Sequence, residues 1–175
     1  MNIRSFWHRG VNRIYTAAVQ KLCEKEFVSS EGQSLRYLFF PCRSSDVLVV
    51  VFQACNDAGP QYNYVRTLQQ CRVNRLLIKD DFGPGKLGVY YLGTQGSCAV
   101  ERAVVELIDR YAAALGGQPR LVFIGSSKGG YAALDFGLQY PGSVMIAAAP
   151  QYNLAQYLDK PKFRATLEAI LGGPA

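Results

Sequence analysis

The residues best suited to chemistry lie at positions 125–129, where Gly-Ser-Ser-Lys-Gly matches the pattern G-x-S-x-G. An apolar run precedes this segment and a helix-forming stretch follows it, which is the context in which the pattern forms a nucleophile elbow. The chain turns so sharply there that the serine is strained and its neighbours two positions away must be small. We therefore predict Ser127 as a nucleophile. The glycines expected to permit the turn are Gly125, Gly129 and Gly130.

Backbone amides near Ser127 are candidates for stabilising an oxyanion. The helix that begins after Ser127 directs N–H groups and a positive dipole end toward negative charge that develops on a substrate. We predict the N–H of Lys128 as the first donor, and that of Gln53 or Ala54, after an earlier apolar strand, as the second. The alternative is a glycine-rich turn that serves only packing or anion binding.

The sequence offers no obvious base for Ser127. A serine hydroxyl is a poor nucleophile until a positioned base removes its proton. In enzymes with this elbow the acid and the histidine follow the serine along the chain, yet the single histidine, His8, precedes it. We expect no catalytic role for His8. Asp159 is the candidate acid, although its position favours a solvated loop carboxylate.

Asp80 and Asp81 follow another apolar run, at positions 75–78. Ligands bind beyond the carboxyl ends of strands in open α/β sheets, so a binding role is open for both aspartates. They could equally cap the turn through the Gly-Pro-Gly at 83–85.

Apolar runs and helical stretches alternate along the chain and predict the fold class. The runs lack period-2 alternation, as expected for strands buried on both faces, and the stretches between them are helical in pattern. This order predicts an α/β fold, a mainly parallel sheet with helices on both faces. We expect a hairpin over 27–40, buried strands at 47–52, 75–78, 121–124 and 144–148, an extra strand at 88–92, helices at about 62–71, 98–115 and 129–140, and a terminal helix over 154–171 interrupted near Pro161.

The first 26 residues form a separate predicted unit. Apolar residues recur at helical spacing between arginines and lysines, which indicates an amphipathic helix over residues 1–26 followed by the domain at 27–175. The helix either packs on that domain or rests its basic face on an anionic membrane surface.

Composition restricts the function classes. A chain of 175 residues with 49% apolar content has enough material for one core. The net charge of +6 comes without runs of like charge and is weak support for nucleic-acid binding, which we do not expect. The five cysteines are odd in number and scattered, so we predict no disulfide framework, no metal, no cofactor and a cytoplasmic location. No apolar run is long enough to span a bilayer.

Four segments together resemble a known family: 62–68 (YNYVRTL), 74–83 (NRLLIKDDFG), 90–93 (YYLG) and 125–130 (GSSKGG). They are similar to bacterial capsular-polysaccharide biosynthesis proteins of the α/β-hydrolase superfamily, whose relatives include accessory-secretion components for serine-rich adhesins. The resemblance covers roughly residues 35–150. It implies an α/β-hydrolase-like fold and a serine acyl hydrolase or acyltransferase acting on a small-molecule substrate or acyl groups of surface glycans, with Ser127 as nucleophile.

Such relatives continue past the position of Ala175 through strands that bear the acid and the histidine. The resemblance therefore implies an incomplete domain that lacks the C-terminal strands. A protein partner or an oligomer is one expected source of the missing groups. The alternative function is a non-catalytic binding or assembly module built on the same scaffold.

Overall fold

A six-stranded sheet organises the protein in this computed structural model, which describes residues 14–56 and 59–174. The strand order is β1-β2-β4-β3-β5-β6. The strands are β1 (Lys25–Val28), β2 (Ser34–Phe40), β3 (Val47–Phe52), β4 (Asn74–Ile78), β5 (Arg120–Ser126) and β6 (Val144–Ala148). The helices are η1 (Pro84–Lys86), α2 (Ala99–Ala114), α3 (Lys128–Gln139), α4 (Leu154–Leu158) and α5 (Arg164–Leu171).

The pairing of the strands confirms the predicted fold class. β1 and β2 form the expected antiparallel hairpin, and β2 also pairs antiparallel with β4. The remaining pairs, β4 with β3, β3 with β5 and β5 with β6, are parallel. Parallel strands place their carboxyl ends at one edge of the sheet, so the segments that follow β3, β4, β5 and β6 gather there.

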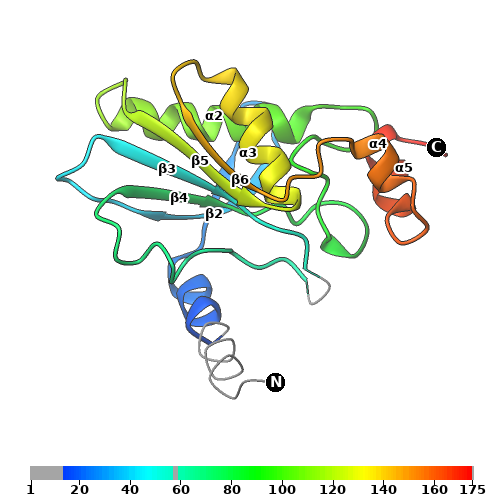
Figure 1. Ribbon diagram of the computed structural model, residues 1–175, viewed down its shortest axis with the longest axis horizontal. Helices are drawn as coiled ribbons and strands as arrows, with labels where there is room; N and C mark the ends of the chain where they lie inside the picture. The colour runs from blue at the N-terminus through cyan, green and yellow to red at the C-terminus, as the bar shows by residue number, and fades with distance from the viewer. Residues whose placement is uncertain (1–13, 57–58, 175) are drawn as a thin grey trace.

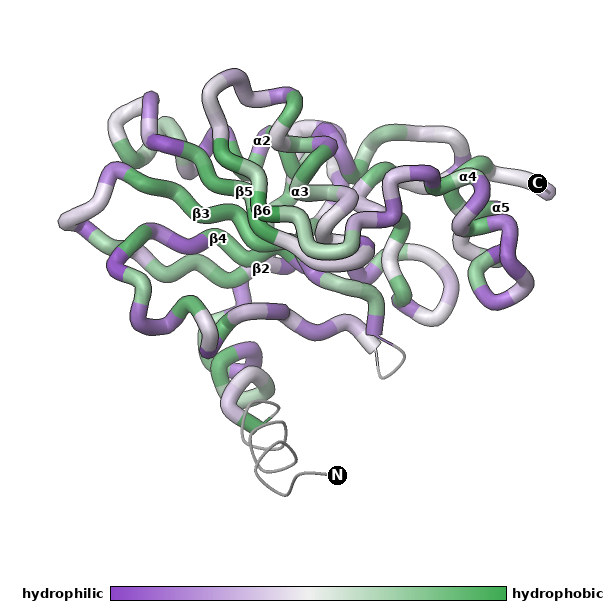
Figure 2. Tube along the Cα trace, in the orientation of Figure 1, coloured by the Kyte–Doolittle hydropathy of each residue, from purple (hydrophilic) through white to green (hydrophobic). Residues whose placement is uncertain are grey.

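Helices α2 and α3 cover one face of the sheet, as Figure 1 shows. Their apolar residues pack on the central strands in a core that contains Phe52 of β3, Phe123 of β5 and Phe136 of α3. The ring of Phe52 stacks on that of Phe136, with centroids 5.1 Å apart. Hydrophobic residues run continuously along β3 at the centre of the sheet, as its burial on both faces requires (Figure 2).

The opposite face carries only part of the helical cover that the sequence predicts. A helix over residues 14–23 packs against this face through Tyr15 and Val19, while Ile14 and Leu22 stay exposed. The prediction of a helix at 62–71 is wrong, because that segment forms a series of turns. Tyr64 has φ 59°, in the left-handed region, which a continuous right-handed helix does not allow.

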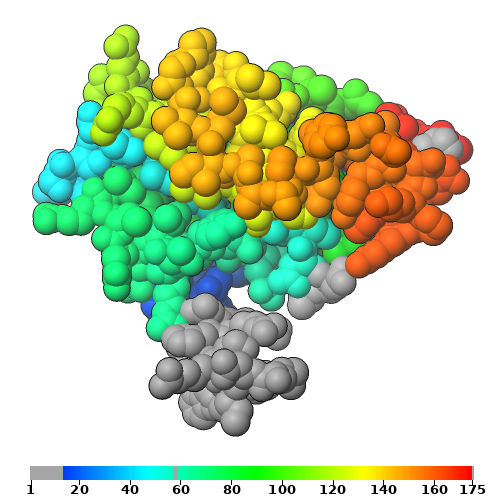
Figure 3. Space-filling view, viewed as in Figure 1, coloured from blue at the N-terminus to red at the C-terminus, as the bar shows by residue number. Residues whose placement is uncertain are grey.

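Two expected strands also differ. β6 forms, but its expected burial on both faces is wrong: it is the last strand of the sheet, and Val144 and Ile146 are 54% and 52% exposed. Figure 3 shows this segment and the chain after it, orange on the colour bar, at the surface of the viewed face. The prediction of a strand at 88–92 is also wrong, because Tyr90 and Tyr91 have φ near 60° and form turns instead.

The C-terminal segment forms two short helices, as the interruption near Pro161 predicts. α4 and α5 lie together at the end of the molecule toward which β5 runs (Figure 1). Within residues 14–56 and 59–174, every helix is too short or too polar to cross a bilayer.

Candidate active site

Ser127 occupies a sharp turn between β5 and α3. Its φ of 55° and ψ of −119° lie in a strained region for a residue with a side chain, as an elbow predicts. Its N–H donates to the carbonyl of Ala148 at 2.9 Å, which ties the turn to the end of β6. The neighbouring backbones are very close: a Cβ on Gly125 would lie 1.9 Å from the carbonyl oxygen of Gly129. Only glycine fits there.

Two further glycines permit contacts around the elbow. A Cβ on Gly129 would lie 2.5 Å from the carbonyl oxygen of Phe52, at the end of β3. At Gly130 the corresponding distance, to the carbonyl of Ala148, is 3.0 Å. The helix therefore begins in close contact with the ends of both β3 and β6.

The hydroxyl of Ser127 has an amide partner. Nε2 of Gln151 lies 2.5 Å from Ser127 Oγ and donates to it, and the hydroxyl of Tyr90 lies 3.5 Å from Gln151 Oε1. A carboxamide N–H has no lone pair with which to take a proton, so Gln151 positions the hydroxyl without activating it. Sequence reasoning missed Gln151. Its position in the sequence could have indicated the contact, because Gln151 follows β6 and Ser127 follows β5, and the carboxyl ends of adjacent parallel strands lie side by side.

The side chain of Lys128 was also missed, since only its backbone was considered. It is fully buried, and its ammonium group lies 3.0 Å from Oδ2 of Asp80, 3.2 Å from the Asp80 carbonyl and 3.0 Å from the Leu87 carbonyl. Gly88 leaves room for this ion pair, because a Cβ there would lie 2.0 Å from Lys128 Nζ. A lone buried ammonium would be very costly, and these acceptors offset that cost.

The two aspartates have partners within the protein. Asp80 is fully buried and accepts from the N–H groups of Val89 and Tyr91, at 3.0 and 3.2 Å, in addition to Lys128. It thus holds the turns over 82–91, in keeping with the capping interpretation. Asp81 forms an ion pair with Arg36 of β2 at 3.0 Å. A binding role for either stays a prediction.

The two amides considered as second oxyanion donors have acceptors already. The N–H of Gln53 donates to the Tyr91 hydroxyl at 2.6 Å, and that of Ala54 donates to Asn63 Oδ1 at 2.7 Å. Burial raises the pKa of Tyr91 well above its usual value, so its hydroxyl stays neutral and donates in turn to a backbone carbonyl. An oxyanion would therefore have to displace one of these acceptors. Lys128 is the first residue of α3, so its N–H has no acceptor within the helix.

The candidate acid Asp159 has a partner other than Ser127. Asp159 ends α4 and is exposed, and its carboxylate pairs with Arg164 at 2.7 Å. His8 lies outside the described residues, which contain no histidine. The described residues also contain no cluster of three or more His, Cys, Asp or Glu side chains placed to hold a metal ion.

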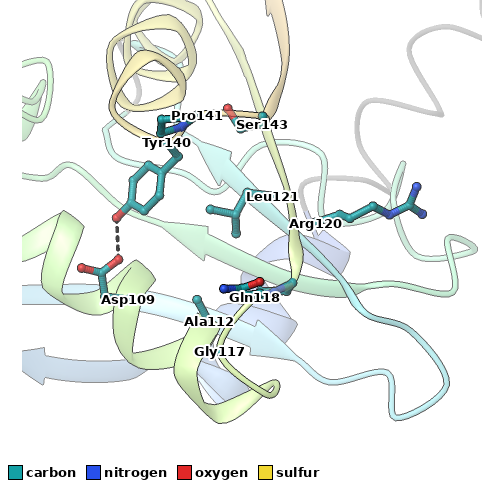
Figure 4. A pocket seen from close by; sticks show the side chains of 11 residues that line it. Asp109, Ala112, Gly117, Gln118, Arg120, Leu121, Tyr140, Pro141 and Ser143 are labelled. Carbon is teal, nitrogen blue, oxygen red and sulfur yellow. Dashed lines mark hydrogen bonds between the residues drawn. The ribbon is translucent and has the colours of Figure 1, made fainter.

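Two cavities lie at opposite ends of this part of the sheet. One, of about 390 Å³, is lined by residues of the segment 150–160 and includes Gln151. The other, of about 400 Å³, lies near the start of β5, where Tyr140 donates to Asp109 at 2.9 Å (Figure 4). Ser127 follows the opposite end of β5, and the first cavity is related to it through Gln151, which lines that cavity and donates to Ser127 Oγ.

Comparisons with known proteins identify the fold. No protein-family model and no curated protein matches the sequence. Among solved structures, the capsule O-acetyltransferase of Neisseria meningitidis serogroup A is similar, with a TM-score of 0.62 and 24% identity over 86% of this chain and 59% of that one. A mutant of that enzyme in complex with CoA gives a TM-score of 0.63 and 24% identity over 87% of this chain and 60% of that one.

A third similar structure is the Gap123 glycosylation-associated complex of Streptococcus agalactiae, with a TM-score of 0.68 and 20% identity over 88% of this chain and 31% of that one. The chain thus spans less than two thirds of the length of each of these proteins. At such identities the likeness concerns the fold. The strand order, the elbow and these similarities together show that the protein has an α/β-hydrolase-like fold.

Proposed function

We propose that this protein contributes the nucleophile domain of a serine-dependent acyl hydrolase or acyltransferase that acts on acyl groups of glycans. The observation that carries the proposal is the geometry of Ser127, whose positive φ, flanking glycines and position at the start of α3 are those of a nucleophile elbow. The similar capsule O-acetyltransferase supports acyl transfer to a surface glycan as the reaction class.

In the proposed reaction the Ser127 hydroxyl attacks an acyl carbonyl, and the developing oxyanion binds at the N–H of Lys128. Collapse of this intermediate breaks the bond to the oxygen or sulfur that carried the acyl group and leaves the acyl group on Ser127. The hydroxyl proton must pass to a base. Gln151, the described side chain bonded to Ser127 Oγ, cannot accept it. We therefore propose that the base comes from outside the described residues, on a longer chain or a partner. The cytoplasmic location stays a prediction that rests on the number and spacing of the cysteines.

Labelling with a fluorophosphonate probe tests this function. General-base assistance contributes roughly 10²- to 10⁴-fold in rate, so the 175-residue chain should label slowly compared with a complete serine hydrolase. Ser127→Ala should abolish the labelling, while the matched control Ser126→Ala should retain it. Absence of labelling at any probe concentration would favour the non-catalytic binding module, for which the Gln151 contact is the supporting observation.

The same assay tests the source of the base. If the chain labels rapidly and His8→Ala removes the rapid phase, then His8 supplies the base and the site is complete within this chain. Slow labelling that His8→Ala leaves unchanged supports the proposed incomplete site.

A further inference from the structure

The cavity that includes Gln151 is bounded by one short segment of chain. Its lining, here called the 150–160 pocket, consists of Pro150, Gln151, Tyr152, Asn153, Gln156, Tyr157 and Lys160. Gln151 belongs to this lining and also donates to Ser127 Oγ at 2.5 Å. A ligand that contacts Gln151 in the pocket would therefore be separated from the proposed nucleophile by that side chain alone. The volume of about 390 Å³ falls within the range of small-molecule sites, roughly 300 to 1,000 Å³.

The lining is rich in groups that suit a sugar ring. Three of its side chains are carboxamides, each of which offers two N–H donors and an accepting oxygen, the complement of neighbouring hydroxyl groups. Asn153 and Gln156 are joined by a hydrogen bond of 3.2 Å, which holds their amides in a fixed relation and uses only part of their capacity. Two tyrosines supply flat apolar surfaces for the C–H groups of a pyranose face.

One of these tyrosines is held in place by its neighbours. The ring of Tyr157 stacks on that of Phe163 with centroids 5.0 Å apart, and Lys160 Nζ lies 4.7 Å from the Tyr157 centroid. A fixed aromatic surface loses little conformational freedom when a ligand binds, which favours binding.

Lys160 gives the pocket its charge. It is the charged residue among those that line the cavity, and the lining includes no carboxylate. The adjacent Asp159 directs its carboxylate to Arg164, at 2.7 Å. A ligand that combines hydroxyl groups with an acidic group therefore matches the lining better than a neutral sugar or a simple anion.

We propose that the 150–160 pocket is a binding subsite for an acidic sugar unit of the glycan, one that carries a phosphate or a carboxylate. This assignment rests on the proposed function, since it places the acyl-bearing or acyl-accepting glycan beside Ser127. The hydroxyl groups bind the carboxamides, the ring packs against Tyr157, and the acidic group pairs with Lys160.

Titrations of the 175-residue chain, followed by amide NMR shifts, test the subsite. The probes are glucose 6-phosphate, glucuronate, glucose and inorganic phosphate. The two acidic sugars should shift the amides of residues 151–160 and bind roughly two- to fivefold more tightly than glucose, the effect of one solvent-accessible charge pair. A preference for one acidic sugar identifies the acidic group as phosphate or carboxylate.

Lys160→Met should reduce the affinity for acidic sugars to that for glucose. Lys162→Met is the matched control, because Lys162 lies over the Phe163 ring at 5.5 Å in the same way but does not line the pocket. Equal binding of inorganic phosphate and glucose 6-phosphate would overturn the sugar assignment. Equal binding of all three sugars, unchanged by Lys160→Met, would overturn the role of charge, and no shift at residues 151–160 would overturn the subsite.

The labelling assay separates this proposal from the function on which it rests. Ser127→Ala should retain sugar binding while it loses the fluorophosphonate reaction. Labelling without sugar binding would overturn the subsite and leave the reaction class standing. Sugar binding without any labelling would overturn the reaction class and leave a glycan-binding module.

Discussion

The ammonium group of Lys128 lies 3.0 Å from Oδ2 of Asp80, and both side chains are completely buried. This contact joins the first residue of α3 to the loop after β4, across 48 positions of sequence. Asp80 also accepts a hydrogen bond from the N–H of Tyr91, and the Tyr91 hydroxyl accepts one from the N–H of Gln53. One buried network thus connects the elbow with the loop after β3.

Replacement of Asp80 by asparagine should destabilise the protein by about 3–5 kcal/mol, because it leaves the Lys128 ammonium buried without its counter-charge. Denaturant unfolding measures the change. The exposed pair of Glu31 and Arg102 provides the control, and Glu31→Gln should cost far less than Asp80→Asn, because solvent screens the exposed pair. Adding Lys128→Met to Asp80→Asn should cost less than the sum of the single changes. Additive losses would show that the two side chains act independently.

Replacement of Gly129 by valine should lower stability by a few kcal/mol, since any Cβ there would meet the carbonyl of Phe52 at 2.5 Å. Gly173→Val is the control, because no atom lies within 4 Å of a Cβ at that position. Thermal melts compare the two variants. An unchanged midpoint for Gly129→Val would mean that the elbow is looser than the structure shows.

Asp135 on α3 should make stability depend on pH. Burial, assisted by the nearby charge of Glu101, raises the pKa of Asp135 from 3.8 to about 6. The folded state therefore prefers the protonated acid, so Asp135 imposes a cost that is absent below about pH 4, grows as pH rises and is complete above about pH 6.

Asp135→Asn should accordingly raise the free energy of unfolding at pH 7.5, by on the order of 1 kcal/mol after allowance for solvent screening, and change it little at pH 4. Glu101→Gln should reduce the same pH dependence, because it removes a charge that opposes ionisation of Asp135. Parallel stability profiles for the wild type and Asp135→Asn between pH 4 and 7.5 would contradict this account.

Replacement of Gln151 by glutamate should accelerate fluorophosphonate labelling of Ser127. A carboxylate at this position can accept the hydroxyl proton, whereas the amide donates to the hydroxyl. Gln151→Ala should leave the slow rate within a few-fold of wild type, since it removes no base. Equal rates for the glutamate and alanine variants would show that the side chain at 151 does not reach Ser127 Oγ in solution.

The sequence by itself determined the elements whose causes are local. The apolar runs at 47–52 and 121–124 predicted central strands, and the glycines around Ser127 predicted a turn that sterics allow in few other sequences. The hairpin and the helices α2 and α3 follow in the same way from patterns within about 15 residues. These features were predicted correctly because neighbours along the chain decide them.

Only the tertiary structure decided which side chains surround the elbow. Gln151 reaches Ser127 because β6 lies parallel to β5, and Asp80 meets Lys128 because the carboxyl ends of β4 and β5 share one edge of the sheet. The exposure of β6 depends on its place in the strand order, and the turns at 62–71 make long-range hydrogen bonds such as that from the Tyr62 hydroxyl to Glu24. Local propensity carries no information about such contacts, because their partners come together only when the sheet assembles.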